Sequence, residues 1–139
     1  MTPEALAQLH ARCFTSPAPW SAQSFKGLLD SPHVFLITDP QNRAFILGRV
    51  VVDEVELLTL ATAPEARRTG LARRLMDAFE AEAKSRGATT AFLEVAEDNT
   101  AARALYSACG YVQNGLRPGY YVRESGSHVA AMTLCKSLA

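Results

Sequence analysis

Hydrophobic residues in the first 30 positions recur at helical spacing. A first helix is expected from Pro3, with an apolar face marked by Leu6, Leu9 and Phe14. Ser21 is a good N-cap for a second helix that extends to Leu29. The segment Ser16–Trp20 contains two prolines, which cannot continue a helix, so we expect a loop there. The start of the chain therefore predicts two helices joined by a loop.

From position 33 onward, short apolar runs predict strands. These strands are expected over His33–Thr38, Arg43–Val52, Val55–Thr62, Thr89–Val95, Tyr111–Leu116 and Val129–Leu134. Two helices interrupt them, over Arg68–Arg86, where apolar residues recur every four positions, and over Asn99–Cys109. Pro118 and Gly119 predict that the stretch between the last two strands is a loop.

The predicted order of elements is α-α-β-β-β-α-β-α-β-β. A central β-α-β crossover inside an otherwise antiparallel set implies a mixed sheet with helices on its faces. The length of 139 residues fits one domain that spans positions 1–139. We therefore expect a single α/β domain.

Composition and charge narrow the possible partners. The chain carries 14 basic and 14 acidic residues, whereas proteins that bind nucleic acid through its backbone are usually basic. The apolar runs are far shorter than the ~20 residues that a membrane span needs. The segment Met1–Phe14 lacks the basic start and long apolar core of an export signal. We therefore expect a cytoplasmic protein that binds neither nucleic acid nor membrane.

The residues that most often bind metal give no pattern here. The three cysteines, Cys13, Cys109 and Cys135, lack metal-ligand spacing. The histidines, which are His10, His33 and His128, are scattered. We predict no metal site, and we assign no catalytic role to any histidine.

Candidate chemistry concentrates in the hexad Arg67–Ala72, which reads R-R-T-G-L-A where a predicted strand passes into a predicted helix. The first backbone N–H groups of a helix have no partner within it, and the helix dipole adds positive potential there. Gly70 lets the backbone approach an anion closely, so the hexad can cradle a phosphate. Nearby arginines suit a small polyphosphate better than a duplex. An ordinary helix start with a polar first turn would give the same hexad.

The hexad resembles the coenzyme A pyrophosphate loop of the GNAT family of N-acetyltransferases, with the signature Arg/Gln-x-x-Gly-x-Gly/Ala. The element order also resembles the GNAT fold over nearly the whole chain, although the opening strand of that fold is short or missing. A closer resemblance is to RimI-type enzymes, which acetylate the N-terminal alanine of a small-subunit ribosomal protein. The segments that carry it are Pro19-Trp20-Ser21 with Phe25, Leu60-Ala61-Thr62, Leu93-Glu94-Val95, Asn99 with Ala104-Leu105-Tyr106, Gly110-Tyr111 and Tyr120-Tyr121.

This resemblance implies acetyl-CoA as co-substrate and no metal. Backbone pairing with the pantetheine arm is expected from Leu60, Ala61 and Thr62. The pyrophosphate loop is expected to comprise Arg67, Arg68, Thr69, Gly70, Leu71, Ala72 and Arg73. Asn99 is expected to contact the coenzyme. The alternative for Leu60, Ala61 and Thr62 is plain strand packing. The alternative for Asn99 is a simple helix cap.

The resemblance also assigns the chemistry. Glu94 is expected to be the general base, since unpaired burial in an apolar strand raises the pKa of a carboxyl group. Tyr106 is expected to be the general acid that protonates the departing thiolate. The alternative for Glu94 is a carboxylate paired with a nearby arginine. The alternative for Tyr106 is an aromatic residue of the core. The acceptor-site walls are expected to be Trp20, Tyr120 and Tyr121.

The sequence thus predicts a monomeric, cytoplasmic N-terminal alanine acetyltransferase whose partner is a ribosomal protein. RimI-type sequences usually carry an acidic residue ahead of the last strand, where this chain has Ser127-His128. A GNAT enzyme acting on another protein N-terminus or a small amine therefore stays open. A non-catalytic acyl-CoA-binding module is also possible, but the presence of both Glu94 and Tyr106 argues against it.

Overall fold

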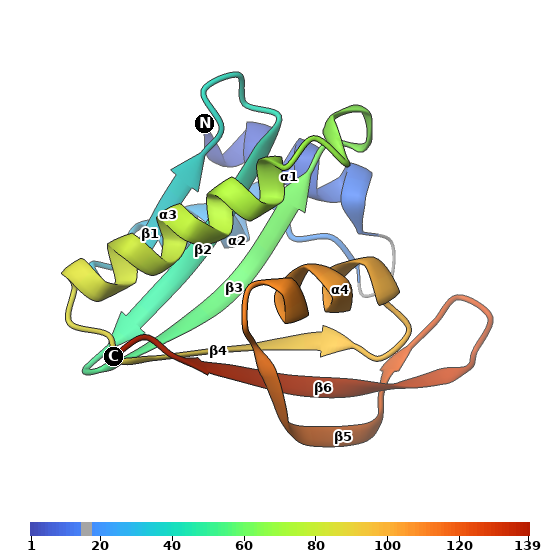
Figure 1. Ribbon diagram of the computed structural model, residues 1–139. Helices are drawn as coiled ribbons and strands as arrows, with labels where there is room; N and C mark the ends of the chain where they lie inside the picture. The colour runs from blue at the N-terminus through green and yellow to red at the C-terminus, as the bar shows by residue number, and fades with distance from the viewer. Residues whose placement is uncertain (15–17) are drawn as a thin grey trace.

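The computed structural model describes residues 1–14 and 18–139. Within these ranges the chain forms one six-stranded sheet and four α-helices, in the order predicted (Figure 1). The elements are α1 (Pro3–Cys13), α2 (Ala22–Leu29), β1 (Val34–Thr38), β2 (Ala44–Val51), β3 (Glu54–Thr62), the 3₁₀ helix η1 (Pro64–Ala66), α3 (Leu71–Ser85), β4 (Thr90–Ala96), α4 (Thr100–Ala108), β5 (Val112–Val122) and β6 (His128–Ser137).

The sheet is mixed, which confirms the predicted class. Its strand order is β1-β2-β3-β4-β6-β5. Strand β3 runs parallel to β4, and the other neighbours are antiparallel. In the described residues α1 is the first element, and β1 and β5 form the two edges of the sheet.

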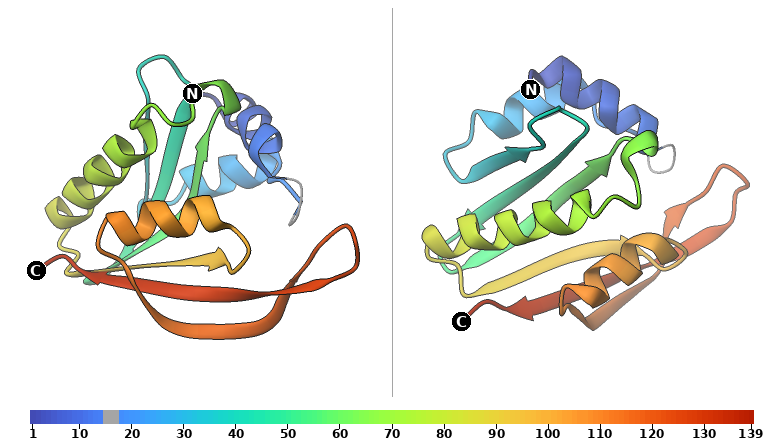
Figure 2. Two further views of the ribbon diagram at one scale, coloured as in Figure 1. Left: turned by 45° about the vertical axis from the view of Figure 1, so that its right-hand side comes forward. Right: turned by 45° about the horizontal axis from the view of Figure 1, so that its top comes forward.

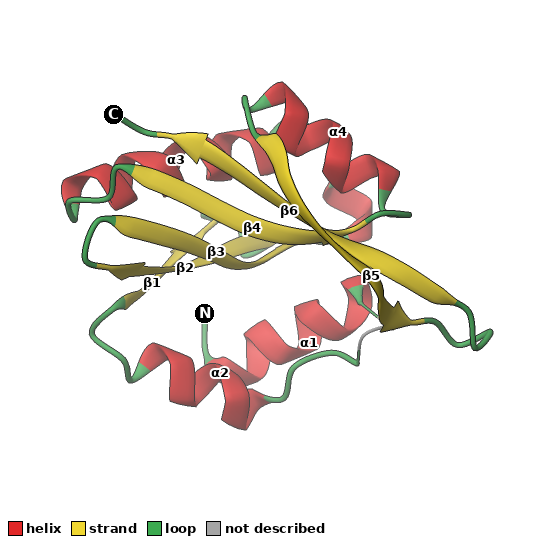
Figure 3. Cartoon of the chain, turned by 90° about the horizontal axis from the view of Figure 1, so that it is seen from below, coloured by secondary structure: helices red, strands yellow, loops and turns green. Residues whose placement is uncertain are grey.

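Helices cover both faces of the sheet (Figures 2 and 3). Helices α1 and α2 lie on one face, and α3 and α4 lie on the other. The apolar face predicted for α3 is confirmed, because its buried residues are Leu71, Leu75, Met76, Phe79 and Ala83. Between α1 and α2, the residues Ala18–Trp20 form neither helix nor strand, as expected, whereas Ser16 and Pro17 of the predicted loop lie outside the described residues.

Three predicted boundaries are wrong by three residues or more, and one of them is the end of β6, which lies at Ser137 instead of Leu134. Helix α3 begins at Leu71 rather than Arg68, because Arg68 and Gly70 have φ values of 64° and 80°, which no right-handed helix contains. Strand β5 continues to Val122 instead of ending at Leu116. The predicted breakers at 118–119 lie in a bulge, since three residues of β5 stand opposite one of β6 between the pairs at Arg117 and Tyr121. An edge strand can hold such a bulge without breaking.

A β-bulge in β3 separates two registers of the sheet. Gly48 pairs with Leu57 while Leu47 pairs with Thr59, so Leu58 is an extra residue. Gly48 faces α3, because a Cβ there would lie 2.7 Å from the ring of Phe79. Side chains alternate along a strand, so Leu47 faces the opposite side, which α1 and α2 cover. The bulge therefore places Leu57 on the α3 face but turns Thr59 toward α1.

The parallel pairing of β3 with β4 is short. It covers only Glu54 to Glu56 of β3 and Thr90 to Phe92 of β4 in the described sheet, and the two strands then diverge (Figure 1). A bulge bends its strand, which is the physical reason that pairing does not resume beyond Leu58. The divergence opens the sheet at its centre.

Candidate active site

A cavity of about 240 Å³ lies where β3 and β4 diverge. Its lining draws on α1, the segment before α2, β3, β4, α4 and β5. Six residues that the sequence singled out meet here, namely Trp20, Leu60, Glu94, Asn99, Tyr106 and Tyr121. The structure therefore gathers in one place residues that are up to a hundred positions apart in the sequence.

The open edge of β3 offers backbone groups to this gap. The N–H of Ala63 bonds to the carbonyl of Arg43, at the end of β2. Alternate residues of an antiparallel strand turn their backbone groups to opposite sides, so Ala61 also faces β2 and does not offer its backbone to the gap. Leu60 and Thr62 face away from β2. The Thr62 carbonyl already accepts from Arg67 Nε at 3.3 Å, so Thr62 can offer its N–H, whereas Leu60 can offer both its N–H and its carbonyl.

The N-terminus of α3 is built differently from those of the other helices. Side chains cap α1, α2 and α4, through Thr2, Ser21 and Asn99 respectively. Helix α3 has Gly70 as N-cap and no side-chain cap. Its first backbone N–H groups are thus left for an external acceptor, which fits an anion such as a phosphate.

The predicted loop residues surround this N-terminus in different ways. Arg67, Arg68 and Arg73 are exposed. Within the described chain, the side chains of Arg68 and Arg73 make no hydrogen bond or ion pair, so both cations can turn toward an anion. The side chain of Leu71 is buried in the core, so only its backbone can contribute. Thr69 donates its hydroxyl to the carbonyl of Ala66 at 2.6 Å and thereby steadies the loop.

Asn99 has a structural role at the start of α4. Its Oδ1 accepts from the N–H of Ala102 at 3.2 Å, so the helix-cap alternative is correct. Asn99 also lines the cavity, and its contact with the coenzyme stays a prediction.

Glu94 is not the unpaired buried carboxylate that the sequence suggested. Its Oε1 lies 3.3 Å from Nη2 of Arg117, and its side chain is 30 % exposed. The ion pair named in the alternative is thus present, because the register of β5 and β6 brings Arg117 across from β4, and the role of Glu94 as a base stays a prediction. Glu94 still lines the cavity beside Tyr106, so it remains within the site where a base is needed.

Tyr106 is the buried aromatic residue of α4. The residue is 7 % exposed, and the centroid of its ring lies 6.2 Å from that of Tyr111, which also fits the alternative of an aromatic core residue. Burial, with a smaller contribution from Cys109, raises the pKa of Tyr106, so the hydroxyl stays protonated at neutral pH. Within the described chain that hydroxyl has no hydrogen-bond partner, and the residue lines the cavity. A protonated, unengaged hydroxyl at this position can donate a proton.

The predicted acceptor walls divide into two groups. Trp20 and Tyr121 line the cavity, whereas Tyr120 does not and is 54 % exposed. Tyr120 packs edge-on against Tyr121 with ring centroids 5.2 Å apart. It therefore supports a wall residue instead of forming the wall. His128 lies away from the cavity, with Nδ1 3.1 Å from the carbonyl of Gly119.

Sequence reasoning missed two buried polar residues of the site. His10 and Thr59 both line the cavity, and His10 Nε2 lies 3.2 Å from Thr59 Oγ1. A signal for His10 was available, because Leu6, His10 and Phe14 recur every four positions on one helix face. No comparable signal marks Thr59, because its orientation depends on the bulge.

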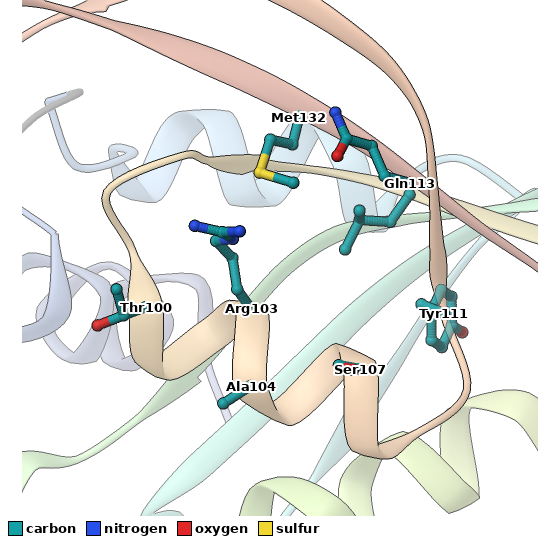
Figure 4. A pocket seen from close by; sticks show the side chains of 8 residues that line it. Thr100, Arg103, Ala104, Ser107, Tyr111, Gln113 and Met132 are labelled. Atoms are coloured by element: carbon teal, nitrogen blue, oxygen red, sulfur yellow. The ribbon is translucent and has the colours of Figure 1, made fainter.

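A second hollow, of about 390 Å³, lies between α4 and the strands β5 and β6 (Figure 4). Arg103 and Ser107 border it from α4, and Gln113 and Met132 border it from the strands. In the described chain no predicted site residue lines this hollow, so it is separate from the cavity between β3 and β4.

Two further properties concern metals and membranes. Among the described residues, no group of three or more His, Cys, Asp or Glu side chains is placed to hold a metal ion. No helix within residues 1–14 and 18–139 is long and apolar enough to cross a membrane.

Comparison with known proteins places this geometry in a family. The acetyltransferase (GNAT) family matches residues 4–111. A protein of Salmonella typhimurium named ribosomal protein bS18-alanine N-acetyltransferase is 36 % identical over 110 residues, which cover 78 % of this chain and 74 % of that protein. The family match over residues 4–111 runs from α1 through α4.

Solved structures show the same fold. The crystal structure of the ribosomal-protein-S18-alanine N-acetyltransferase from Escherichia coli has a TM-score of 0.86 and 28 % identity, covering 99 % of this chain and 88 % of that chain. Arabidopsis thaliana NAA60, solved with acetyl-CoA, has a TM-score of 0.79 at 15 % identity and covers 98 % of this chain and 93 % of its own. The latter similarity concerns the fold alone.

Proposed function

We propose, on the premise that this chain belongs to the acetyltransferase (GNAT) family, that it acetylates the N-terminal α-amino group of a protein. The acceptor we propose is the N-terminal alanine of a small-subunit ribosomal protein, in the cytoplasm, and the enzyme we expect is a monomer. The relative from Salmonella typhimurium carries that activity in its name. The observation that carries the proposal is the cavity in which the open edge at Leu60 meets Glu94 and Tyr106.

Acetyl-CoA supplies an activated acetyl thioester and a polyanionic handle. The uncapped N-terminus of α3 fits that handle, because Gly70 leaves backbone N–H groups accessible beside Arg68 and Arg73. Leu60 and Thr62 turn backbone groups toward the gap and can pair with the pantetheine arm as a neighbouring strand would. Asn99 borders the same cavity from the start of α4.

The residues of the cavity divide the chemistry of acetyl transfer. An α-amino group has a pKa of about 8, so Glu94 needs to remove a proton only from the ammonium fraction. The neutral amine attacks the thioester carbon, and the N–H of Leu60 donates to the oxyanion. The carbon–sulfur bond then breaks, and Tyr106 gives its proton to the departing thiolate. The attacking nitrogen loses its extra proton as the amide forms, and this proton passes through solvent to the Tyr106 oxygen, which restores the phenol. The products are the acetylated N-terminus and free coenzyme A.

A second acceptor class is favoured by one observation. The entry to the last strand carries Ser127 and His128, the first residue of β6, instead of an acidic residue, and His128 Nδ1 lies 3.1 Å from the carbonyl of Gly119, away from the cavity. This difference in charge supports another protein N-terminus or a small amine as the alternative acceptor.

In the experiment, the purified protein is incubated with acetyl-CoA and with a panel of peptides that differ in their first residue. Acetylated products are read by mass, and free coenzyme A is read by thiol release. A peptide with a blocked N-terminus controls for side-chain acetylation, and small amines test the alternative. Acetylation of the alanine peptide above the others supports the proposal. Thiol release with amines only would favour the alternative, and binding of acetyl-CoA without turnover would indicate a non-catalytic module.

A further inference from the structure

His10 is enclosed by aromatic rings beside the cavity. It is 3 % exposed, and its ring stacks on those of Phe14 and Trp20, with centroids 4.3 and 5.1 Å away. Burial lowers the pKa of His10 to about 4. The imidazole is therefore neutral at physiological pH and carries a single N–H.

The hydrogen bonds of His10 determine where that proton is. The backbone N–H of Trp20 donates to Nδ1 at 3.1 Å, so Nδ1 is the acceptor nitrogen. The ring proton must then be on Nε2, which lies 3.2 Å from Thr59 Oγ1. His10 consequently donates to the hydroxyl oxygen of Thr59, and Thr59 is not the donor in this pair.

Thr59 is left with a proton that no group within residues 1–14 and 18–139 accepts. A threonine hydroxyl has one proton to donate and can accept through its oxygen, and His10 uses the oxygen. In the described chain nothing else hydrogen-bonds to this hydroxyl. Thr59 is only 7 % exposed, yet it lines the cavity. A buried donor without a partner is costly, so a ligand in the cavity is the natural acceptor for it.

Tyr106 and Thr59 lie on opposite faces of the sheet, and this arrangement indicates which ligand accepts the proton. Tyr106 belongs to α4, which lies on the same face of the sheet as α3 (Figure 3), and it lines the cavity, so the sulfur of the thioester belongs on that side. Thr59 faces α1, on the opposite side, together with His10. The acceptor must therefore enter from the face on which Thr59 presents its proton.

We propose that Thr59 recognises the carbonyl oxygen of the acceptor's first residue, and that His10 is the positioning residue that aims the Thr59 hydroxyl at it. The inference rests on the proposed function and deepens it. The preferred substrate class is an α-amino amide, as at a peptide N-terminus, over an amine that lacks the neighbouring carbonyl.

The test compares two acceptors on matched variants. One acceptor is an alanine peptide, and the other is the same peptide with its first amide replaced by an alkene isostere, which keeps the amine and the shape but lacks the oxygen. The measured quantity is kcat/KM for the peptide divided by kcat/KM for the isostere. Any general loss of activity cancels in this ratio. We expect Thr59→Val to lower this ratio about tenfold, the value of one hydrogen bond, and Thr59→Ser to restore it.

Variants of His10 test the positioning role. The amide N–H of His10→Gln can reach the place of Nε2, whereas His10→Asn keeps an acceptor near Nδ1 but no donor to Thr59. We expect the ratio to survive in His10→Gln and to fall in His10→Asn. An acetyl-CoA-dependent thermal shift in every variant establishes that each one is folded.

The outcomes separate this inference from the proposed function. If the wild type acetylates no peptide N-terminus, both fail. If it acetylates the peptide but Thr59→Val leaves the ratio unchanged, or slows both acceptors equally, only the role of Thr59 is overturned. Equal ratios in His10→Gln and His10→Asn would remove His10 as the positioning residue.

Discussion

The two sides of the central cavity differ in how many of their residues are buried. On one side, Ala44–Gly48 of β2 are all buried, and α3 buries five side chains. On the other side, β5 has no buried residue along its described length, and Tyr106 is the single buried residue within the described span of α4. The sides are joined in the sheet by the short pairing of Glu54–Glu56 with Thr90–Phe92.

This difference follows the division of roles in the site. The well-packed side supplies groups that must hold still, namely the backbone at Leu60, the N-terminus of α3 and the hydroxyl of Thr59. The sparsely packed side supplies Glu94 and Tyr106, whose side chains we propose to exchange protons. Regions with few buried contacts open at lower free-energy cost, so substrate entry is expected to move α4 and β5 more than β2 and α3.

The largest expected effect lies on the sparsely packed side. Tyr106→Phe should lower kcat by ~10²–10⁴-fold with little change in acetyl-CoA affinity, since the ring stays and only the proton donor is lost. Steady-state kinetics and a binding titration measure the two quantities. Tyr111→Phe is the matched control, because Tyr111 donates to Glu80 outside the cavity and should keep its turnover. Wild-type turnover in Tyr106→Phe would remove Tyr106 from the mechanism.

The next prediction concerns the free energy of unfolding and tests whether the well-packed side is stable only while His10 is neutral. The unfolded chain binds a proton at His10 near pH 6.5, whereas the folded chain does so only at about pH 4. The unfolded state therefore holds more protons between these values, and the free energy of unfolding falls as pH falls. The loss should reach about 3 kcal/mol near pH 4 and be absent above pH 6.5.

Urea unfolding at a series of pH values measures this loss. His10→Gln is the reference, because glutamine does not titrate while every carboxylate of the chain still does. A wild-type curve parallel to that of His10→Gln between pH 4 and 6.5 would show that His10 is protonated equally in both states.

A smaller effect concerns the N-terminus of α3. At 100-fold excess over Kd, acetyl-CoA should add about 2.7 kcal/mol to the stability of the wild type. Gly70→Val should abolish that gain by placing a side chain beside the bare N–H groups. Gly87→Val is the control, because Gly87 has a similar φ of 92°, lies at the other end of α3 and has open space around it.

Both glycine variants lose stability through backbone strain, but only Gly70→Val should lose the thermal shift. A shift that persists in Gly70→Val would place the pyrophosphate elsewhere.

The smallest effect concerns Glu94 and its partner Arg117. Glu94→Gln should lower kcat most at low pH, because the amine is then mostly protonated. The loss should shrink by up to about 30-fold between pH 6.5 and 9, following the neutral fraction of an amine with pKa near 8. Glu97→Gln, at an exposed position three residues on, is the control. A pH-independent kcat ratio with a raised KM for peptide would make Glu94 a binding residue.

Much of the fold was readable from periodicity. Apolar residues four apart in α3 and the apolar runs of β2 and β3 predicted their elements, because burial imposes those spacings. The start of α3 was not readable, since a positive φ at Arg68 leaves no mark in the sequence. The extent of β5 was also missed, because Pro118 and Gly119 break most strands but only bulge an edge strand.

The site was predictable to the extent that it depends on local motifs. The hexad at Gly70 and the positions of Glu94 and Tyr106 followed from the family resemblance, and their proposed roles stay predictions. The ion pair of Glu94 with Arg117 depends on the register of β5 against β6, which the sequence does not specify. His10 was overlooked because a lone histidine on an apolar face gives no indication of what it bonds.

The extra residue Leu58 has an evolutionary consequence. It makes the geometry of the site depend on how many residues β3 contains, and not on which residue occupies the bulge. Conservative substitutions at Leu58, which lines the cavity and packs against the core, should keep the bulge, whereas loss of one codon there would straighten the strand and close the gap beside β4. Insertions and deletions in this strand are therefore expected to alter the cavity more than a conservative change of amino acid at Leu58.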